Sequence, residues 1–504
     1  MIHFEAPVED ILFSLTKIAG ASSLEGWNED LARDVIGHFA SLAEGKIAPL
    51  NEIGDQQGCK FVDGAVKMPD GFCDAFRELA EGGWQGLTAP EEFGGMEQSA
   101  VLAAAVSEIF SGANHSMQMV CNLVPGAITT LLRFGTQEQQ KTWIPKLASG
   151  EALSSMCLTE PSAGSDLSNI RTKAVQNGND WAITGEKIFI SGGDQDMSKD
   201  ILHLVLARSD PDKKDIKGLS LFLCSKLDAK DAIKVTRIEE KLGLHASPTC
   251  HMVFDNTPAQ LIGEQGGGLA AMFTLMNHAR IDVSLQGVAH AARAYAISRA
   301  YADQRSQGRK ADGSTAKLSD HADVHRMLAE QRTLATTARA MAHIALVEME
   351  KRMRPELAEF LTPLCKFYCT EAGIRAADLG IQILGGYGYL NEYQISQTWR
   401  DARITSIYEG ANGIHYLSLA TRGLRFNGGT AADAFEALVL ELAPTVKVSA
   451  QLMHWRQCRE TVLAAEDPTQ HAFDFARSSA ALMKMALLTK IASVRCDLSL
   501  KAPT

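Results

Sequence analysis

The sequence predicts an α+β protein in which a small antiparallel β-domain lies between two helical regions. Apolar residues recur with helical spacing in the first part of the chain, short β-branched and aromatic runs between turn residues follow, and long alanine-rich stretches come last. This order indicates a β-domain inserted between two helical bodies, and such a junction commonly binds a ligand. We expect an N-terminal helical domain over 1–150, a β-domain over 151–265, a helical bundle over 266–424 and a helical C-terminal extension over 425–504.

The N-terminal region contains stretches whose apolar residues recur every three or four positions, as on one face of a helix. Each stretch ends at a glycine, which commonly follows the last turn of a helix. The expected helices cover residues 101–112, 127–135 and 138–150.

The middle region consists of short runs rich in Val, Ile, Leu, Phe and Trp, bounded by Gly, Asp, Asn and Pro. Runs of this kind are typical of strands joined by turns. The expected strands cover residues 181–191, 200–209, 217–226 and 249–256.

The last region is alanine-rich and has long intervals without proline, for example between Pro258 and Pro355. Its apolar residues keep a helical period over many turns, which favours a bundle of long helices. The expected helices cover residues 272–305, 321–352 and 356–384, with two more at 432–443 and 473–492 in the extension.

Composition and charge exclude several classes of protein. The 504 residues include 49 basic and 60 acidic side chains, giving a net charge of −11, and no Lys/Arg-rich run offers the positive surface that a nucleic-acid partner requires. The first residues show no basic segment followed by an apolar core, and the most apolar tail segment contains two lysines and is too short to span a bilayer. We expect a cytoplasmic protein without a membrane span.

The ten cysteines are scattered, and no pair has the short spacing of a CxxC metal motif. Cys365 and Cys369 stand four residues apart on one expected helix face, where core packing is the favoured interpretation and a metal pair the alternative. This cysteine usage fits a reducing compartment.

Three glycine- or serine-rich stretches can bring backbone close to a ligand. They are MCLTEPSAGSD (156–166), KIFISGG (187–193) and QILGGYGYLNEY (382–393). Each has an ordinary alternative: a turn entering a strand, a strand leading into a hairpin, and a glycine at a helix end. Alternation places Phe189 and Ser191 on one face of their strand.

A fourth stretch, RITSIYEGANGIHYL (403–417), contains a single carboxylate. Glu409 follows an apolar run and precedes the small pair Gly410–Ala411, so it loses water on one side and has backbone packed close on the other. Two interpretations remain open from these residues: Glu409 caps the next helix, or Glu409 is a catalytic base.

Six motifs in this order (TEPSAGSD, ISGG, NHAR, ADQR, QILGGYGY and RDARITSIYEG) resemble those of the acyl-CoA dehydrogenase family. The resemblance covers about residues 30 to 424, and the NHAR and RDARITSIYEGANGI segments look most like the methylthiopropionyl-CoA dehydrogenase branch. The tail is shorter than is usual in that branch. The resemblance implies the same helical, β, helical fold and FAD as the cofactor.

The resemblance also implies which residues bind FAD. Because some of them would reach FAD across a subunit interface, it implies at least a dimer, and we expect a homodimer or a homotetramer. Phe189 stands where many members have tryptophan, and Arg305 matches an arginine that reaches the FAD pyrophosphate of the neighbouring subunit. The implied FAD-binding residues are Leu158, Thr159, Phe189, Ser191, Arg305, Gln382, Gly385 and Gly386.

In the same way the resemblance implies that Glu409 is the catalytic base and that its N–H donates to the thioester carbonyl. The implied substrate-binding residues are Ser165, Asn277, Arg280 and Gly410. Arg280 and Arg305 are 25 residues apart, about seven turns, so that one continuous helix can present both near one face.

Two positions depart from the family pattern. Ala411 stands where a threonine usually touches FAD, a loss of about 1 kcal/mol for one hydrogen bond. His415 stands where glutamine is frequent, and it is expected either to pack in the core or to line the pocket.

The implied reaction is α,β-dehydrogenation of an acyl-CoA to a trans-2-enoyl-CoA, with electrons passed to an electron-transfer flavoprotein. A short acyl chain is expected, with methylthiopropionyl-CoA as the specific hypothesis. Two alternatives stay open: an oxygen-using oxidase or flavin monooxygenase on the same fold, and a non-catalytic binding or assembly relative.

Overall fold

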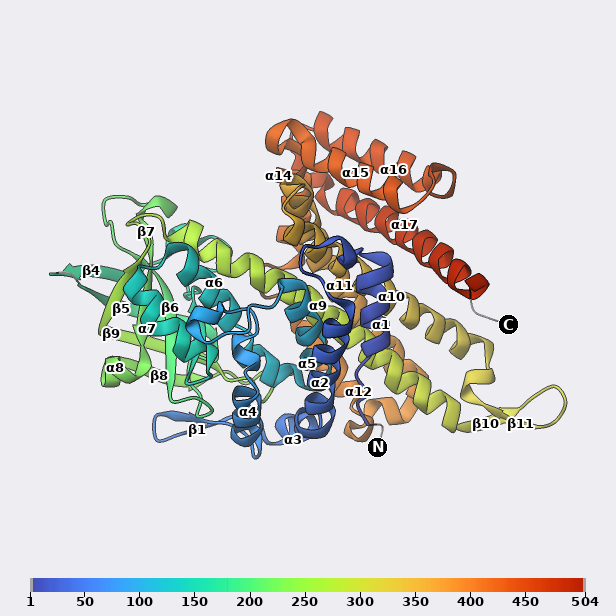
Figure 1. The fold of residues 1–504 in the computed structure, drawn as a ribbon, viewed down its shortest axis with the longest axis horizontal. Helices are drawn as coiled ribbons and strands as arrows, with labels where there is room; N and C mark the ends of the chain where they lie inside the picture. Colours follow the sequence, from blue (N-terminus) through green and yellow to red (C-terminus); the bar gives the residue numbers. More distant parts are fainter. Residues whose placement is uncertain (1–2, 179, 502–504) are drawn as a thin grey trace. The chain divides into compact units, whose positions relative to one another are not determined.

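Two units, each assembled from segments that are distant in sequence, make up the chain. The computed structural model describes residues 3–178 and 180–501 (Figure 1). Unit 1 comprises Met1–Ser41, Ala100–Gly112 and Arg280–Thr504, and unit 2 comprises Leu42–Ser99 and Ala113–Ala279. The predicted order of elements, helices then strands then helices, is confirmed.

The helices of the first part of the chain are mostly short, whereas those after the sheet reach 30 residues or more. Those before the sheet are α1 (Val8–Phe13), α2 (Glu29–Leu42), α3 (Leu50–Gln57), α4 (Phe72–Glu81), α5 (Ala100–Cys121), α6 (Val124–Phe134) and α7 (Gln137–Ala148). Those within or after it are α8 (Lys226–Ala229), α9 (Gly268–Gln304), α10 (Ala322–Lys351), α11 (Pro355–Leu384), α12 (Ile395–Arg403), α13 (Asn412–Ala420), α14 (Arg422–Arg425), α15 (Thr430–Leu442), α16 (Thr445–Ala464) and α17 (Ala472–Lys501).

One predicted helix end is wrong. The expected stop at Gly112 lies inside α5, which runs on to Cys121 with a local break at Asn114, whose φ is −159°. Gly112 has a packing role instead, because a Cβ there would lie 3.0 Å from the Phe4 ring. Gly135, in contrast, does end its helix, and its N–H donates to the Leu131 carbonyl oxygen.

The strands of unit 2 form a seven-stranded sheet in the described part of the chain, with the order β3-β6-β4-β5-β9-β7 and β8 paired to β9. Because β7 also pairs with β6, the pairings close into a ring. The strands are β3 (Ala152–Cys157), β4 (Lys173–Asn177), β5 (Asp180–Ser191), β6 (Asp200–Arg208), β7 (Leu219–Ser225), β8 (Ile233–Ile238) and β9 (Thr249–Ile262). Two short hairpins lie elsewhere: β1 (Lys60–Val62) with β2 (Ala65–Lys67), and β10 (Ser306–Arg309) with β11 (Thr315–Lys317).

The sheet is mixed rather than purely antiparallel. β3 and β4 each pair with β6 in parallel, and the remaining pairs are antiparallel. The β4–β5 hairpin lies between β3 and β6 in the sequence, so the chain can return in its original direction. Side-chain alternation reports which face is buried but not strand direction, so the sequence pattern could not distinguish the two.

The buried side chain of Lys187 connects several segments of this sheet through hydrogen bonds. The Nζ atom of Lys187, on β5, donates to the Leu158 and Leu206 carbonyl oxygens at 2.9 and 2.7 Å and to Glu160 Oε1 at 2.8 Å. Glu160 also accepts the N–H groups of Arg171 and Thr172. Because the Lys187 side chain is fully buried, these partners replace the water that it has lost.

Unit 1 is built on the two long helices α10 and α11, which pack along each other. Cys365 and Cys369 on α11 are fully buried, and their thiols lie 3.5 Å from the carbonyl oxygens of Met341 and Ala338 on α10, consistent with core packing. Lys366, on the same helix, is also fully buried.

The C-terminal extension packs on this helical body. Helices α15, α16 and α17 lie together at the orange-to-red end of the chain in Figure 1. Phe435 and Phe475, on α15 and α17, contact the Phe360 ring of α11, with ring centroids 4.5 and 6.3 Å apart. Trp455 on α16 joins this cluster and donates its indole N–H to Ser479.

In residues 3–178 and 180–501, no helix combines the length and the apolarity that crossing a bilayer requires.

Replacing Lys187 with methionine should destabilise unit 2 by about 3 kcal/mol, because Glu160 would keep its buried charge and lose its counterion. Urea denaturation followed by far-UV circular dichroism measures the change. The matched control is Lys213→Met, which removes an exposed ion pair with Asp210 and should change stability by less than about 0.5 kcal/mol. Equal effects in the two variants would contradict the prediction.

Candidate active site

Glu409 lies in a strained turn between α12 and α13. Its φ is +54°, a left-handed conformation that costs a residue with a side chain about 1–3 kcal/mol, and Gly410 follows with φ +95°. Such a conformation persists only where surrounding contacts hold it. The N-cap of α13 is Ala411, without a side-chain capping hydrogen bond, so the capping interpretation of Glu409 finds no support in this geometry.

Contacts on both sides hold this turn. On the N-terminal side, the Tyr408 hydroxyl donates to Gln286 Oε1, and Gln286 Nε2 donates to Asp282 Oδ2 at 3.1 Å. On the C-terminal side, Lys366 Nζ donates to the Gly410 carbonyl oxygen at 2.6 Å. The turn is therefore fixed by α9 before Glu409 and by α11 after it.

The electrostatic surroundings of Glu409 suit a base. Burial raises the pKa of Glu409 to about 7, with Asp282 acting in the same direction, while the cations Arg280 and Lys366 oppose the rise. A solvated glutamate has a pKa near 4.5 and is a weaker base. Glu409 thus combines greater basicity with enough cationic support to ionise near neutral pH.

Desolvation lowers the pKa of both cations near Glu409. Desolvation lowers the pKa of Lys366 to about 7, and the carboxylate of Glu409 opposes this effect. Desolvation also lowers the pKa of Arg280, again against Glu409. Each positive charge is therefore most stable when Glu409 is ionised, as expected for coupled groups.

His415 is buried and lies directly against Gly410. Its Nε2 is 3.1 Å from the Gly410 carbonyl oxygen, and because a carbonyl oxygen can only accept, Nε2 carries the hydrogen. Burial lowers the pKa of His415 to about 3, so the ring is neutral. Its burial agrees with the expectation that His415 packs in the core. Its polar contact is to the backbone of the turn. Ala411 is exposed.

The structure brings together the four expected FAD-binding residues of unit 2. Leu158 and Thr159 follow β3, and hydrogen bonds from Lys187 Nζ and the Ile188 N–H to their carbonyl oxygens place them beside the end of β5. Phe189 stands there at an irregularity of the β5–β9 ladder, with φ +60° and 60% of its surface exposed.

A large aromatic side chain exposed at an irregular strand end offers a flat apolar surface, and Ser191 lies two residues further along the same strand. The neighbouring Leu158 and Thr159 add backbone and a hydroxyl. These residues therefore fit the ring system of a flavin, which needs one apolar face and polar groups at its edge.

The other expected FAD-binding residues lie in unit 1 and are exposed. α9 ends at Gln304, so the continuous helix expected to carry both arginines stops one residue before Arg305, whose N–H still donates to the Tyr301 carbonyl oxygen. The Arg305 guanidinium lies 5.9 Å from the Tyr387 ring centroid. This contact brings Arg305 beside the turn at the end of α11 that contains Gly385 and Gly386; Gln382 lies in the last turn of α11.

The expected substrate-binding residues belong to both units: Ser165 and Asn277 to unit 2, Arg280 and Gly410 to unit 1. Ser165 is exposed in the loop after β3, and Asn277 is exposed on α9. Arg280 is half-buried three residues further along α9 and faces the charge of Glu409. Gly410 is half-buried in the turn itself.

Sequence reasoning missed Lys366 and Asn412. Lys366 is a lone lysine in a run of α11 whose other side chains are almost all buried and apolar, and that contrast was a readable signal. Asn412 accepts a hydrogen bond from Lys366 Nζ at 3.1 Å and exchanges hydrogen bonds with Thr370, but its residue type and position gave no indication of this role.

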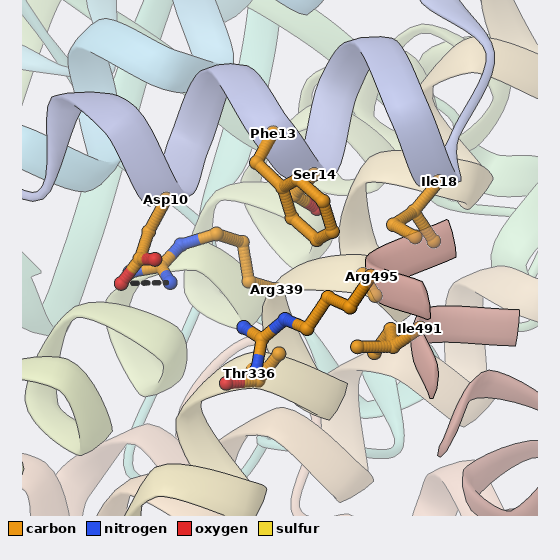
Figure 2. A pocket seen from close by; sticks show the side chains of 9 residues that line it. Asp10, Phe13, Ser14, Ile18, Thr336, Arg339, Ile491 and Arg495 are labelled. Atoms are coloured by element: carbon orange, nitrogen blue, oxygen red, sulfur yellow. Dashed lines mark ion pairs between the residues drawn. The ribbon is translucent and has the colours of Figure 1, made fainter. Parts of the chain in front are cut away.

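A cavity elsewhere in unit 1 contains none of the predicted site residues. Figure 2 shows it between the first helical segment, α10 and α17, with the Arg339 guanidinium directed at Asp10 and the Arg495 guanidinium beside Thr336. The Arg339 guanidinium is committed to an ion pair with the buried Glu108 at 2.7 Å and a longer one with Asp10. Because Glu108 and Asp10 balance the charge of Arg339, the presence of this arginine at the cavity does not require a bound ligand.

Comparison with known proteins places these observations in a family. The chain matches the N-terminal, middle and C-terminal domain models of acyl-CoA dehydrogenases over residues 34–151, 155–257 and 266–424. It is 39% identical to the 3-methylmercaptopropionyl-CoA dehydrogenase of Ruegeria pomeroyi, over 86% of this chain and 79% of that protein. It is 32% identical to a butyryl-CoA dehydrogenase of Syntrophomonas wolfei, over 73% and 66% of the two chains.

Among solved structures, a chain from the structure titled "Electron transferring flavoprotein of Acidaminococcus fermentans: Towards a mechanism of flavin-based electron bifurcation" superposes with a TM-score of 0.70 and 26% identity. The match covers 80% of this chain and 99% of that one.

Replacing Gly410 with alanine should destabilise unit 1 by about 1–3 kcal/mol, because φ is +95° and the new Cβ would lie 3.0 Å from His415 Nε2. Urea denaturation measures the change. Gly413→Ala is the matched control three residues along, where a Cβ meets nothing within 4 Å inside a helix, so alanine should be neutral or stabilising by up to about 1 kcal/mol. A neutral Gly410→Ala would sink the argument that the turn is constrained.

Proposed function

The chain belongs to the acyl-CoA dehydrogenase family, and from that premise we propose that it catalyses FAD-dependent α,β-dehydrogenation of a short acyl-CoA, with Glu409 as the base. The predicted family, fold and enzyme class are confirmed, and so is FAD as the cofactor of the family. The individual roles of the site residues and the identity of the substrate stay proposals.

The observation that carries the proposal is the environment of Glu409. It is the carboxylate whose pKa burial raises to about 7, and it stands in a left-handed turn beside two cations. The buried carboxylates Glu160 and Glu108 are instead paired directly, with Lys187 and Arg339. A raised pKa in a strained turn is the pattern expected of a group that must accept a proton.

The reaction removes a proton from the α-carbon and a hydride from the β-carbon. The α-hydrogen of a thioester is weakly acidic, so the carbonyl must be polarised by hydrogen-bond donors, and we assign one of these to the Glu409 N–H. The Glu409 carboxylate accepts the α-proton, the β-hydrogen leaves with its electron pair, and a trans double bond forms between the two carbons. FAD, when bound, supplies the acceptor of this hydride; Phe189 and Ser191 would hold its ring system, and Arg305 its pyrophosphate.

The substrate proposal rests on the relatives. The name of the Ruegeria pomeroyi protein specifies 3-methylmercaptopropionyl-CoA, which is the methylthiopropionyl thioester, and that of the Syntrophomonas wolfei protein specifies butyryl-CoA. Both acyl groups are short. We therefore propose a short acyl chain, with methylthiopropionyl-CoA as the first candidate and Ser165, Asn277 and Arg280 on the CoA portion.

The remaining proposals concern partners. A structural neighbour comes from a structure titled for an electron transferring flavoprotein, which supports an electron-transfer flavoprotein as the electron acceptor. Arg305, Gln382, Gly385 and Gly386 are exposed in the single chain, as residues that serve a neighbouring subunit would be, and this supports a homodimer or homotetramer. A cytoplasmic location also stays a prediction.

The test is anaerobic mixing of the purified yellow protein with acyl-CoAs from propionyl to octanoyl and with methylthiopropionyl-CoA, followed by flavin bleaching. In Glu409→Gln the bleaching rate should fall at least about 100-fold, the usual contribution of a general base. The rate in the parent should rise with pH through about 7, because Glu409 must ionise before it accepts a proton. The exposed Glu350→Gln is the control and should bleach like the parent.

Other results would name other functions. Bleaching that survives in Glu409→Gln would remove Glu409 as the base. Rapid peroxide formation in air would identify an oxidase. A colourless protein that cannot be reconstituted with FAD would identify a non-catalytic relative.

A further inference from the structure

Lys366 makes contacts that the dehydrogenation chemistry does not account for. It is a lysine with no exposed surface, on a helix whose neighbouring side chains are mostly apolar. Its Nζ donates to the Gly410 carbonyl oxygen at 2.6 Å and to Asn412 Oδ1 at 3.1 Å. A fully buried ammonium group is costly unless its partners need it, so these contacts ask for an explanation.

Both acceptors belong to the segment that begins at Glu409. The Gly410 carbonyl follows the strained residue directly, and Asn412 is the first residue of α13. Thr370, one turn after Lys366 on α11, exchanges hydrogen bonds with the same Asn412 side chain. The ammonium group thus ties two successive points of the turn to one rigid helix.

We propose that Lys366 is a positioning residue for Glu409: its ammonium group fixes the Gly410 carbonyl and the Asn412 side chain and so holds Glu409 in its left-handed conformation. This inference rests on the proposed role of Glu409 as the base. His415 is the second donor to the same carbonyl, and because its ring is neutral it contributes direction without charge.

The charge of Lys366 gives it a second effect, which a neutral donor could not have. Lys366 stabilises the ionised form of Glu409, together with Arg280 and against Asp282. The titratable groups facing this site are Arg280 and Asp282 from α9, Lys366 from α11, His415 from α13, and Tyr408 beside Glu409. Lys366 therefore touches the turn through two hydrogen bonds and, in its protonated form, stabilises the ionised carboxylate.

The experiment measures the ionisation of Glu409 and the bleaching rate separately. Infrared difference titration follows the protonated carboxyl band, which Glu409→Gln assigns by its disappearance, and this needs no turnover. In Lys366→Met the titration midpoint should move upward by about one pH unit, because a nearby opposite charge is lost. The bleaching rate at high pH should fall at least about tenfold, because the base is no longer held.

Two further variants separate position from charge. Lys366→Arg keeps the cation but not the fit, so its midpoint should stay that of the parent while the rate falls. Thr362→Ala, one turn earlier on α11, removes a hydroxyl that bonds only within its own helix, and it should change neither quantity.

A midpoint and rate like those of the parent in Lys366→Met would overturn the proposal. If that variant does not fold, Lys366→Arg decides, because a raised midpoint or an unchanged rate there contradicts it. If the parent binds FAD and no acyl-CoA bleaches it, the proposed function fails, and the infrared midpoint still reports whether Lys366 controls Glu409.

Discussion

The hydrogen bond from the Lys366 ammonium group to the Gly410 carbonyl is the interaction on which the site depends. A base for a weakly acidic carbon must lose water to gain strength, yet a carboxylate without water tends to stay protonated. The chain resolves this conflict by placing Arg280 and Lys366 where their positive charges oppose the rise in the pKa of Glu409. The cation that touches the turn does so through backbone and amide oxygens, which leaves the carboxylate oxygens available for a proton.

The helices around Glu409 present the charged and hydrogen-bonding groups that this arrangement requires. α9 presents Arg280, Asp282 and Gln286 within two turns, and the last two are linked at i and i+4. The same helix thereby supplies a cation to the carboxylate and, through Tyr408, an anchor for the residue before it. α11 supplies the anchor after it. Because both anchors belong to helices of 30 residues or more in the packed core, they restrict the turn far more than a loop could.

Local chemistry was readable from the sequence, whereas contacts across long separations were not. Glu409 could be singled out because its neighbours in sequence are apolar on one side and small on the other. Lys366 could not be assigned to it, because 44 residues separate Lys366 from the carbonyl that it binds. The same limit applied to Gly112, which resembles a helix stop until Phe4 is seen packing against it, and to strand direction, which alternation does not encode. The long helices were predictable because their period persists over many turns.

The C-terminal extension restrains the Glu409 turn indirectly, through its contacts with α13. Tyr416 on α13 donates to Glu371 on α11 at 2.5 Å, and Arg477 on α17 pairs with the same carboxylate. The Phe473 ring lies 5.5 Å from that of Tyr416. Tyr416 is one helical turn after Asn412, so α17 fixes the helix whose first turn Lys366 holds. An added helical segment therefore need not touch a substrate to matter. By restraining α13 it limits how far the Glu409 turn can relax, and the anchoring of the base extends from α11 to α17.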